Sequence, residues 1–207
     1  MVNASRHRRD IAVIGTSAGG VSALQTLFGA LPNPPPGVVV AVLHRSPFFE
    51  SVLPLVLGSK NSQTIVEPEQ QERAKHGRIY IAPRDRHLVF DDGRFALNRG
   101  PKQHHTRPAI DPLFRSAAAS YGARVVGVVL TGGGDDGVDG LLAIKAAGGV
   151  SIAQDPDEAP HPWMPASAIL YDHVDLVLPL VDIAPALVAL ARGETVPARA
   201  GRRAAGG

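Results

Sequence analysis

Short runs of consecutive apolar residues alternate along this chain with segments in which apolar residues recur every three or four positions. Three runs, at residues 11–14, 38–43 and 125–130, have the unbroken apolar character of strands buried on both faces. Shorter runs predict strands at 150–153 and 174–178, and helical spacing predicts helices at 21–28, 110–117, 141–144, 166–170 and 183–190. This alternation predicts an α/β fold with a doubly wound, mostly parallel sheet flanked by helices.

The middle of the chain departs from this alternation. Three short strands separated by turns rich in Asp, Pro and Gly are predicted there, at 78–82, 87–90 and 94–97. They predict a small antiparallel insertion around residues 78–97. The preceding stretch, 63–77, is polar and predicted to lie on the surface, and a short helix is predicted over 48–56, with Pro54 expected to kink or shorten it.

Length and charge suggest a single domain with two basic ends. The 207 residues fit one domain, which we predict to span 11–191. The formal charge is +2, but residues 1–10 hold three Arg and residues 192–207 hold four, which leaves 14 basic and 17 acidic residues between them. We therefore expect a basic tail at 1–10, a disordered tail at 192–207, and no nucleic-acid-binding surface on the slightly acidic body.

Residue types that are absent narrow the choice of compartment. The chain has no cysteine, which excludes disulfides and thiolate metal sites. No apolar run approaches the ~20 residues that span a bilayer, and the amino-terminal residues lack the hydrophobic centre of a signal peptide. These features predict a cytoplasmic protein that does not insert into a membrane.

The sequence IAVIGTSAGG, at residues 11–20, joins the first predicted strand to the first helix through a glycine-rich turn. Such a turn directs the first backbone N–H groups of the helix at whatever lies above Ser17, which suits a bound anion or a developing oxyanion. Either the glycines cradle a phosphate, or Ser17 is a nucleophile on a G-x-S-x-G turn with Gly15 and Gly19. A strand-to-helix turn with a capping serine is the structural alternative.

Each of the three most apolar strands is followed by a polar side chain with catalytic potential: Ser17, His44, and either Asp135 or Asp136. Ligands of a parallel sheet bind at the carboxyl ends of its strands, so these side chains are expected to meet. A serine is a weak nucleophile until an imidazole accepts its proton, and a carboxylate holds that imidazole in the required tautomer. The set is therefore a candidate nucleophile, base and orienting acid, although each residue alone also fits a structural role.

The loop RGPKQHHTRP, at residues 99–108, contains two adjacent histidines. His104 and His105 suggest a metal site at first sight. Adjacent residues do not share a face, however, and no carboxylate stands at ligand spacing. We therefore predict a solvated loop and no metal.

Several motifs follow one another in a consistent order from about residue 11 to residue 190: IGTSAGG, the strand ending in His44, IYIAPRDRHL, RPAIDPLFRS, LTGGGDDGVDGLLAIKAAGG, AQDP and MPASAI. The series resembles the catalytic domain of the CheB-type protein-glutamate methylesterases of bacterial chemotaxis. The resemblance implies hydrolysis of γ-glutamyl methyl esters on the helical signalling region of a chemoreceptor. It also implies deamidation of glutamine in related members, and no need for a metal or cofactor.

The resemblance assigns roles to individual residues. Ser17 is then the nucleophile, His44 the base and Asp136 the acid that orients it, with Asp135 at a variable position. The expected oxyanion hole consists of the backbone N–H groups of Gly133, Ala18 and Gly19. The candidates for docking an acidic receptor surface are Arg99 and Arg107.

The chain departs from the family pattern in two respects. Gly133 stands where the family has methionine, which leaves the N–H available but loosens the loop that aims it. Family members usually carry a phosphorylatable receiver domain before the esterase, and ten residues cannot hold one, so we expect no receiver domain in this chain. The alternatives are an inactive or nucleotide-binding α/β module, and an esterase of a pathway other than chemotaxis. The presence of His44, where a nucleotide-binding fold would place an acidic residue, disfavours nucleotide binding.

Overall fold

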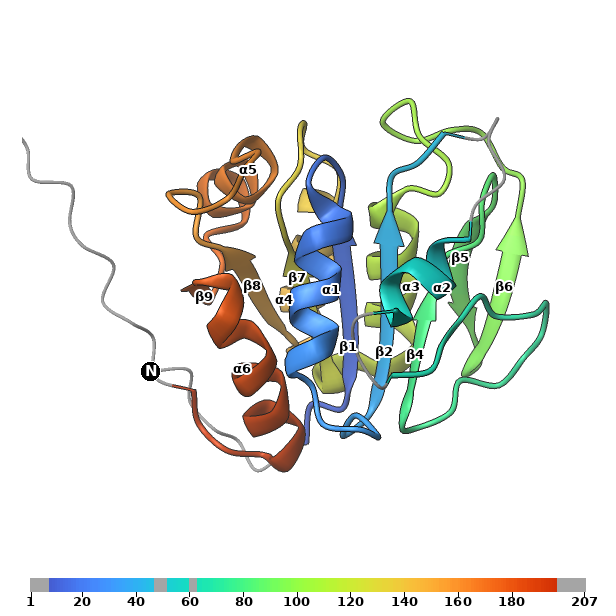
Figure 1. Ribbon diagram of the computed structural model, residues 1–207, viewed down its shortest axis with the longest axis horizontal. Helices are drawn as coiled ribbons and strands as arrows, with labels where there is room; N and C mark the ends of the chain where they lie inside the picture. The colour runs from blue at the N-terminus through green and yellow to red at the C-terminus, as the bar shows by residue number, and fades with distance from the viewer. Residues whose placement is uncertain (1–7, 47–51, 60–62, 197–207) are drawn as a thin grey trace, which may run out of the picture.

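The computed structural model describes residues 8–46, 52–59 and 63–196. Its centre is a seven-stranded parallel sheet in the order β3-β4-β2-β1-β7-β8-β9 (Figure 1). The strands are β1 (Ile11–Thr16), β2 (Val38–Leu43), β3 (Ile65–Val66), β4 (Arg78–Ile81), β7 (Val125–Val129), β8 (Val150–Gln154) and β9 (Leu176–Leu178). β1 lies in the middle of the sheet, so the turn that follows it emerges at the centre of the carboxyl edge, the upper edge in Figure 1.

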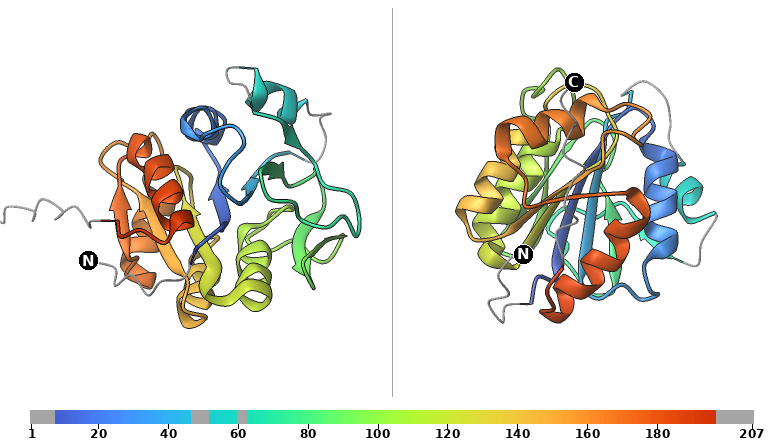
Figure 2. Two further views of the ribbon diagram at one scale, coloured as in Figure 1. Left: turned by 90° about the horizontal axis from the view of Figure 1, so that it is seen from below. Right: turned by 90° about the vertical axis from the view of Figure 1, so that its left-hand side faces the viewer.

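Helices cover both faces of this sheet and give three layers, which the two views of Figure 2 separate. One face carries α1 (Gly20–Ala30), α2 (Leu53–Gly58) and α6 (Leu180–Arg192). The other carries α3 (Ile110–Tyr121), the short 3-10 helix η1 (Gly122–Arg124), α4 (Val138–Ala146) and α5 (Trp163–Asp172). The prediction of a doubly wound, mostly parallel sheet is confirmed.

Side chains alternate along β1 and so contribute to two separate parts of the core. Ala12 and Ile14 pack with residues of α1 and α6, whereas Ile11 and Val13 pack with residues of α3 and α4. All four are buried. A strand covered on both faces needs apolar residues at every position, which explains the unbroken apolar run in the sequence.

The predicted insertion is correct for two strands and wrong for the third. β5 (His87–Asp91) and β6 (Arg94–Asn98) form an antiparallel pair. The segment at 78–82, however, provides β4, which runs parallel to β2 in the main sheet. Its residues 79–81 are fully buried, so they belong to the main core. The stretch predicted as polar surface contributes β3, a two-residue strand that pairs with β4.

The role of Pro54 and the placement of residues near the two ends of the domain differ from the prediction. Pro54 lies in the first turn of α2, where a missing N–H costs no helical hydrogen bond, so it starts the helix and does not kink it. Arg9 is buried, and its N–H donates to Leu190 O at 3.0 Å. Val196 is also buried, so the described ends of both predicted tails pack against the domain. Residues 1–7 and 197–207 of the predicted tails, and Phe48, lie outside the described residues.

No helix in the described ranges is both long enough and apolar enough to cross a membrane.

Candidate active site

Ser17 lies in the turn between β1 and α1, at the centre of the carboxyl edge. Gly19 has φ 77°, a left-handed conformation that side chains disfavour, and this conformation turns the chain into α1. The Ser17 N–H donates to Thr131 O at 3.1 Å, and the Gly20 N–H donates to Ser17 O at 2.9 Å. The Thr131 hydroxyl in turn donates to Ala18 O at 3.1 Å. Thr131, which the sequence did not single out, thus ties the serine turn to the end of β7.

The glycines after Thr131 differ in what surrounds them. A Cβ at Gly132 would collide with Met164 Sδ and approach Ser17 Cβ to 3.0 Å, so a glycine is required beside the serine. A Cβ at Gly133 would meet no described atom within 4 Å. The position at which the family pattern has methionine therefore faces open space.

His44 and Asp136 meet across the end of β1. The His44 side chain follows β2, Asp136 follows β7, and Nε2 of the histidine is 2.7 Å from Oδ2 of the aspartate. An ionised carboxylate only accepts hydrogen bonds, so Nε2 carries the proton and Nδ1 is left as the basic nitrogen. Asp135 points elsewhere: it is exposed and contacts His104. The structure thus brings together His44 and Asp136, and separates Asp135 from them.

Asp136 and Asp111 cap each other's helices, an arrangement that we call the reciprocal caps. Asp136 Oδ2 accepts the Ile110 N–H at 2.8 Å and Oδ1 accepts the Asp111 N–H at 3.0 Å, which caps the start of α3. Asp111 Oδ1 accepts the N–H groups of Gly137 at 3.1 Å and Gly140 at 2.7 Å, which caps the start of α4. Each carboxylate satisfies N–H groups that a helix start would otherwise leave unpaired.

The environment of Asp136 favours its ionised form. Burial raises the pKa of this carboxyl, because it disfavours a charge. The hydrogen bonds from His44 and from the N–H groups of Ile110 and Asp111 outweigh burial, and the pKa of Asp136 is lowered. Asp136 is therefore a carboxylate at neutral pH, as an orienting acid must be.

Ser17 and His44 open into one pocket of about 420 Å³. Its lining is Ser17, His44, His104, His105, Thr106, Gly133, Gly134, Asp135 and Asp136. Within the described part of the chain, no hydrogen bond joins the Ser17 hydroxyl to His44. Such bonds are often long in a resting enzyme and form in the substrate complex, so the arrangement is compatible with proton transfer between them.

Backbone N–H groups near Ser17 are available to a ligand. The N–H groups of Ala18, Gly19 and Gly133 make no hydrogen bond to any other described residue, whereas that of Ser17 is taken by Thr131. Gly133 lines the pocket and Ala18 adjoins Ser17. These three predicted oxyanion donors are therefore unpaired beside the serine.

The two arginines predicted to dock a receptor have different environments. Arg107 donates through Nε and Nη2 to Asp85 Oδ1, at 2.9 and 2.7 Å, and through Nη1 to the carbonyls of Arg99 and Gly100. Its side chain is only 18% exposed, and it braces the loop from within. Arg99 is 65% exposed, with Nε 3.9 Å from Asp85. Of the two, Arg99 has the side chain available to a partner.

His104 is fixed by carboxylates, which the prediction of a solvated loop did not foresee. Its Nε2 lies 3.1 Å from Asp111 Oδ2 and its Nδ1 lies 3.1 Å from Asp135 Oδ1. Ligand atoms of His104, Asp111 and Asp136 lie within 4.8 Å of one another, a spacing that a metal ion could bridge. Both oxygens of Asp136 and Oδ1 of Asp111 already accept hydrogen bonds from other residues, and Asp111 Oδ2 contacts His104 directly.

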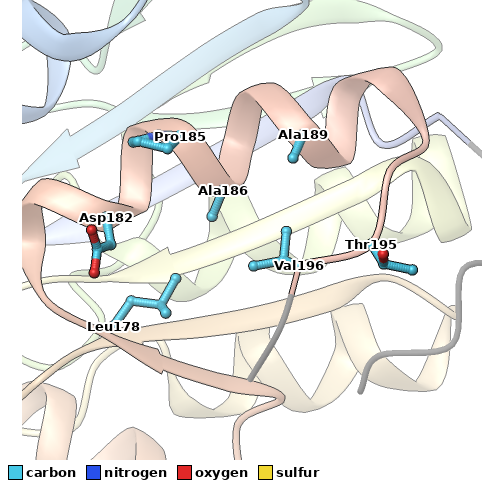
Figure 3. A pocket seen from close by; sticks show the side chains of 7 residues that line it. All are labelled: Leu178, Asp182, Pro185, Ala186, Ala189, Thr195 and Val196. Atoms are coloured by element: carbon cyan, nitrogen blue, oxygen red, sulfur yellow. The ribbon is translucent and has the colours of Figure 1, made fainter. Parts of the chain in front are cut away.

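A second cavity, of about 330 Å³, lies between α6 and the edge strand β9 (Figure 3). Apolar side chains dominate its lining, and Asp182 and Thr195 are its polar members. β7 and β8 separate this edge from β1. None of the predicted site residues lines this cavity, whereas Ser17, His44 and Asp136 all line the Ser17 pocket.

Comparison with known proteins identifies relatives that match most of this chain. The family model described as CheB methylesterase matches residues 12–187. The chain superposes on the crystal structure of the Thermotoga maritima CheB methylesterase catalytic domain with a TM-score of 0.83 and 37% sequence identity, covering 87% of this chain and 98% of that one.

Curated relatives carry the name protein-glutamate methylesterase/protein-glutamine glutaminase. One from Methanosarcina mazei is 35% identical over 89% of this chain, and one from Paramagnetospirillum magneticum is 38% identical over 88%. The chain spans about half the length of these two, 52% and 49%. A protein of Leptospira interrogans, provisionally given the same name, is 37% identical, and the match covers 86% of this chain and 93% of that protein.

Proposed function

Because this chain belongs to the CheB methylesterase family, we propose that it is a serine hydrolase that demethylates γ-glutamyl methyl esters on bacterial chemoreceptors. We propose that it also deamidates glutamine at such sites, as the names of its relatives suggest. One observation carries the proposal: the 2.7 Å contact between His44 and Asp136 lies in the pocket that Ser17 lines. The methylated helices of a receptor lie in the cytoplasm, which is the location that the proposal requires.

The chemistry begins with Ser17. Its hydroxyl oxygen forms a bond to the ester carbonyl carbon while its proton passes to Nδ1 of His44, the nitrogen that Asp136 does not occupy. The resulting imidazolium is stabilised by Asp136, which stays ionised. The negative charge that develops on the carbonyl oxygen is met by the unpaired N–H groups of Gly133, Ala18 and Gly19.

The second half of the reaction reverses these proton transfers. The bond to the methoxy group breaks, and His44 gives its proton to that group, which leaves as methanol. Water then attacks the acyl-serine while His44 removes a proton from it, and the Ser17 oxygen recovers a proton as glutamate is released. With a glutamine substrate the same steps release ammonia.

Receptor recognition is a separate part of the proposal. Arg99 is the better of the two candidate docking residues, because its guanidinium is exposed at the start of the loop that borders the pocket. The guanidinium of Arg107 is occupied by Asp85 and by two carbonyls, which supports a role in shaping the loop. A small methyl ester needs no docking surface, so the two roles can be separated by substrate size.

The experiment labels the protein with a fluorescent phosphonate and measures hydrolysis of a methylated receptor fragment. Ser17→Ala should abolish labelling and lower hydrolysis by roughly 10³-fold or more, because the nucleophile is gone. Ser22→Ala is the matched control: Ser22 is exposed on α1, five residues along the chain, and its replacement should leave both readouts unchanged. Near-normal turnover by a folded Ser17→Ala protein would refute the mechanism.

A further inference from the structure

His104 is held in an unusual position at the rim of the Ser17 pocket. Both of its ring nitrogens face a carboxylate, Asp135 at 3.1 Å from Nδ1 and Asp111 at 3.1 Å from Nε2. A neutral imidazole has one donor and one acceptor nitrogen, whereas an imidazolium has two donors. The two acceptors therefore match a doubly protonated, positively charged ring.

The charge would lie beside two buried carboxylates. Asp111 and Asp136 are 1% and 2% exposed, and the N–H of Asp111 donates to Asp136 within the reciprocal caps. A ring nitrogen of His104 and oxygens of both carboxylates lie within 4.8 Å of one another. Two buried negative charges at this spacing repel, and an adjacent cation offsets the repulsion.

Asp136 consequently has an imidazole on each side. His44 contacts it directly through Nε2 at 2.7 Å, and His104 lies within 4.8 Å on the side of Asp111. A positive charge on His104 favours the ionised form of this carboxylate, because opposite charges attract. The charge of His104 therefore bears on how well Asp136 is kept ionised as the acid that orients His44.

We propose that His104 is a positioning residue for this reaction: its imidazolium, held between Asp111 and Asp135, balances the buried carboxylate pair and extends toward lower pH the range in which Asp136 is ionised and orients His44. The catalytic part of this proposal rests on the proposed function, in which His44 is the base. The positive charge of His104 does not depend on whether the protein is an enzyme.

The other charged groups near His104 do not replace it. From α3, Arg115 Nη1 is 4.0 Å from Asp111 and 3.6 Å from Asp139 of α4, and its side chain is 43% exposed. His104 is itself 35% exposed, but its Nε2 lies 3.1 Å from Asp111 Oδ2, nearer than Arg115. His105, the neighbour in the same loop, is exposed. Of these groups, His104 thus lies closest to the buried carboxylate of Asp111.

The protonation tendencies of the cluster point the same way. Burial lowers the pKa of His104, but Asp136, Asp111 and Asp135 outweigh it, and the pKa of His104 is raised. Burial also raises the pKa of Asp111, and the negative charge of Asp136 raises it further. The hydrogen bond from the Gly140 N–H lowers it, but the net shift is upward. The cluster therefore retains a proton at a pH where an isolated histidine would lose it.

The test measures the pH dependence of kcat/KM on a small methyl ester. His104→Asn removes the charge and suits the backbone, because φ at this residue is 47° and asparagine tolerates the left-handed region. The acid limb of the profile should move upward by about half a pH unit to one pH unit, since without the cation the buried carboxylate pair takes up a proton at higher pH. His104→Arg keeps a cation with several donors and should hold the limb near that of the wild type.

The matched control is His173→Asn. His173 is also left-handed, with φ 50°, and it is exposed at the carboxyl end of α5, away from the pocket. It should leave the profile unchanged. An acid limb that does not move in His104→Asn, or that moves equally in His104→Arg, overturns the proposal while the wild-type activity upholds the proposed function.

A second readout does not depend on activity. Long-range ¹H–¹⁵N spectra of the histidine side chains, assigned by the loss of a signal in His104→Asn, should show both ring nitrogens of His104 protonated at pH 7. A neutral His104 ring at that pH overturns the proposal, whether or not the protein hydrolyses an ester.

Discussion

Replacing the two adjacent aspartates one at a time distinguishes their roles most sharply. In Asp136→Asn, one carboxylate oxygen becomes an NH₂ group, yet this side chain faces three donors: His44 Nε2 and the N–H groups of Ile110 and Asp111. If the amide oxygen faces His44 and Ile110, the NH₂ group faces the Asp111 N–H. If it is flipped, the NH₂ group donates to His44 and forces the proton onto Nδ1. That tautomer cannot accept the proton of Ser17.

The magnitude follows from these contacts. The loss of the negative charge and the wrong tautomer together should lower kcat by roughly 10³- to 10⁴-fold. One buried donor is left without an acceptor, which costs about 1–3 kcal/mol of stability at pH 7. The pKa of Asp136 is lowered in the folded state, so its contribution to stability is present above about pH 4 and is lost as the pH falls further. The stability difference between variant and wild type should therefore shrink in acid.

Asp135→Asn provides the comparison. Asp135 is 65% exposed, and asparagine can still accept the contact from His104 Nδ1, so kcat should fall by no more than about threefold. The assay is methyl-ester hydrolysis at pH 7.5, with urea melts of both variants at pH 7 and pH 4 as the control for folding. Equal losses of kcat in two folded variants would refute the assignment of the orienting carboxylate to Asp136.

Two further predictions concern residues outside the triad. Arg107→Ala and Asp85→Ala should each lower hydrolysis of a small methyl ester several-fold, because their ion pair braces the loop at 99–108. Arg99→Ala, in contrast, should lower only the rate on a receptor fragment. A normal small-ester rate in Arg107→Ala would contradict the bracing role. Asp172 is buried, neither of its oxygens has a hydrogen-bond partner among the described residues, and Lys145 Nζ lies 3.9 Å from its Oδ1. Burial outweighs the lowering effect of Lys145, and the pKa of Asp172 is raised. The ionised form of Asp172 therefore destabilises the fold as the pH rises. In urea melts, Asp172→Asn should be more stable than the wild type by about 1 kcal/mol at pH 8, and this difference should be smaller near pH 5. A difference that does not depend on pH would contradict this.

The elements that sequence alone predicted well are those buried on both faces. The run at 38–43 matches β2 residue for residue, because a central strand requires apolar side chains at every position. β3 has two residues, too few for any pattern, and it forms because β4 offers it an edge. The strand at 78–81 was assigned to the wrong sheet, since the sequence reveals that Ile79 and Ile81 are apolar but not which strand lies beside them.

The site was predictable as far as it depends on strand ends. Ser17, His44 and Asp136 each follow a strand of the central sheet, so the topology brings them to one edge. Asp111 was missed because it meets Asp136 through the packing of α3 against the start of α4, which leaves no spacing in the sequence. His104 was predicted to be solvated because its carboxylate partners are 7 and 31 residues away along the chain. A loop arginine carries no sign of what its guanidinium meets, and for this reason Arg107 was predicted to be a docking residue.

The reciprocal caps have an evolutionary consequence. Asp136 serves the base and the start of α3 with the same two oxygens, so its loss would weaken the fold as well as the chemistry. The Ser17 hydroxyl makes no hydrogen bond within the described ranges, so no comparable structural role is seen for it there. A descendant that abandoned catalysis would be free to change the serine early and would be held to the aspartate much longer. Among relatives, the aspartate therefore indicates only that the fold is shared, whereas the serine indicates that the enzyme is catalytically active.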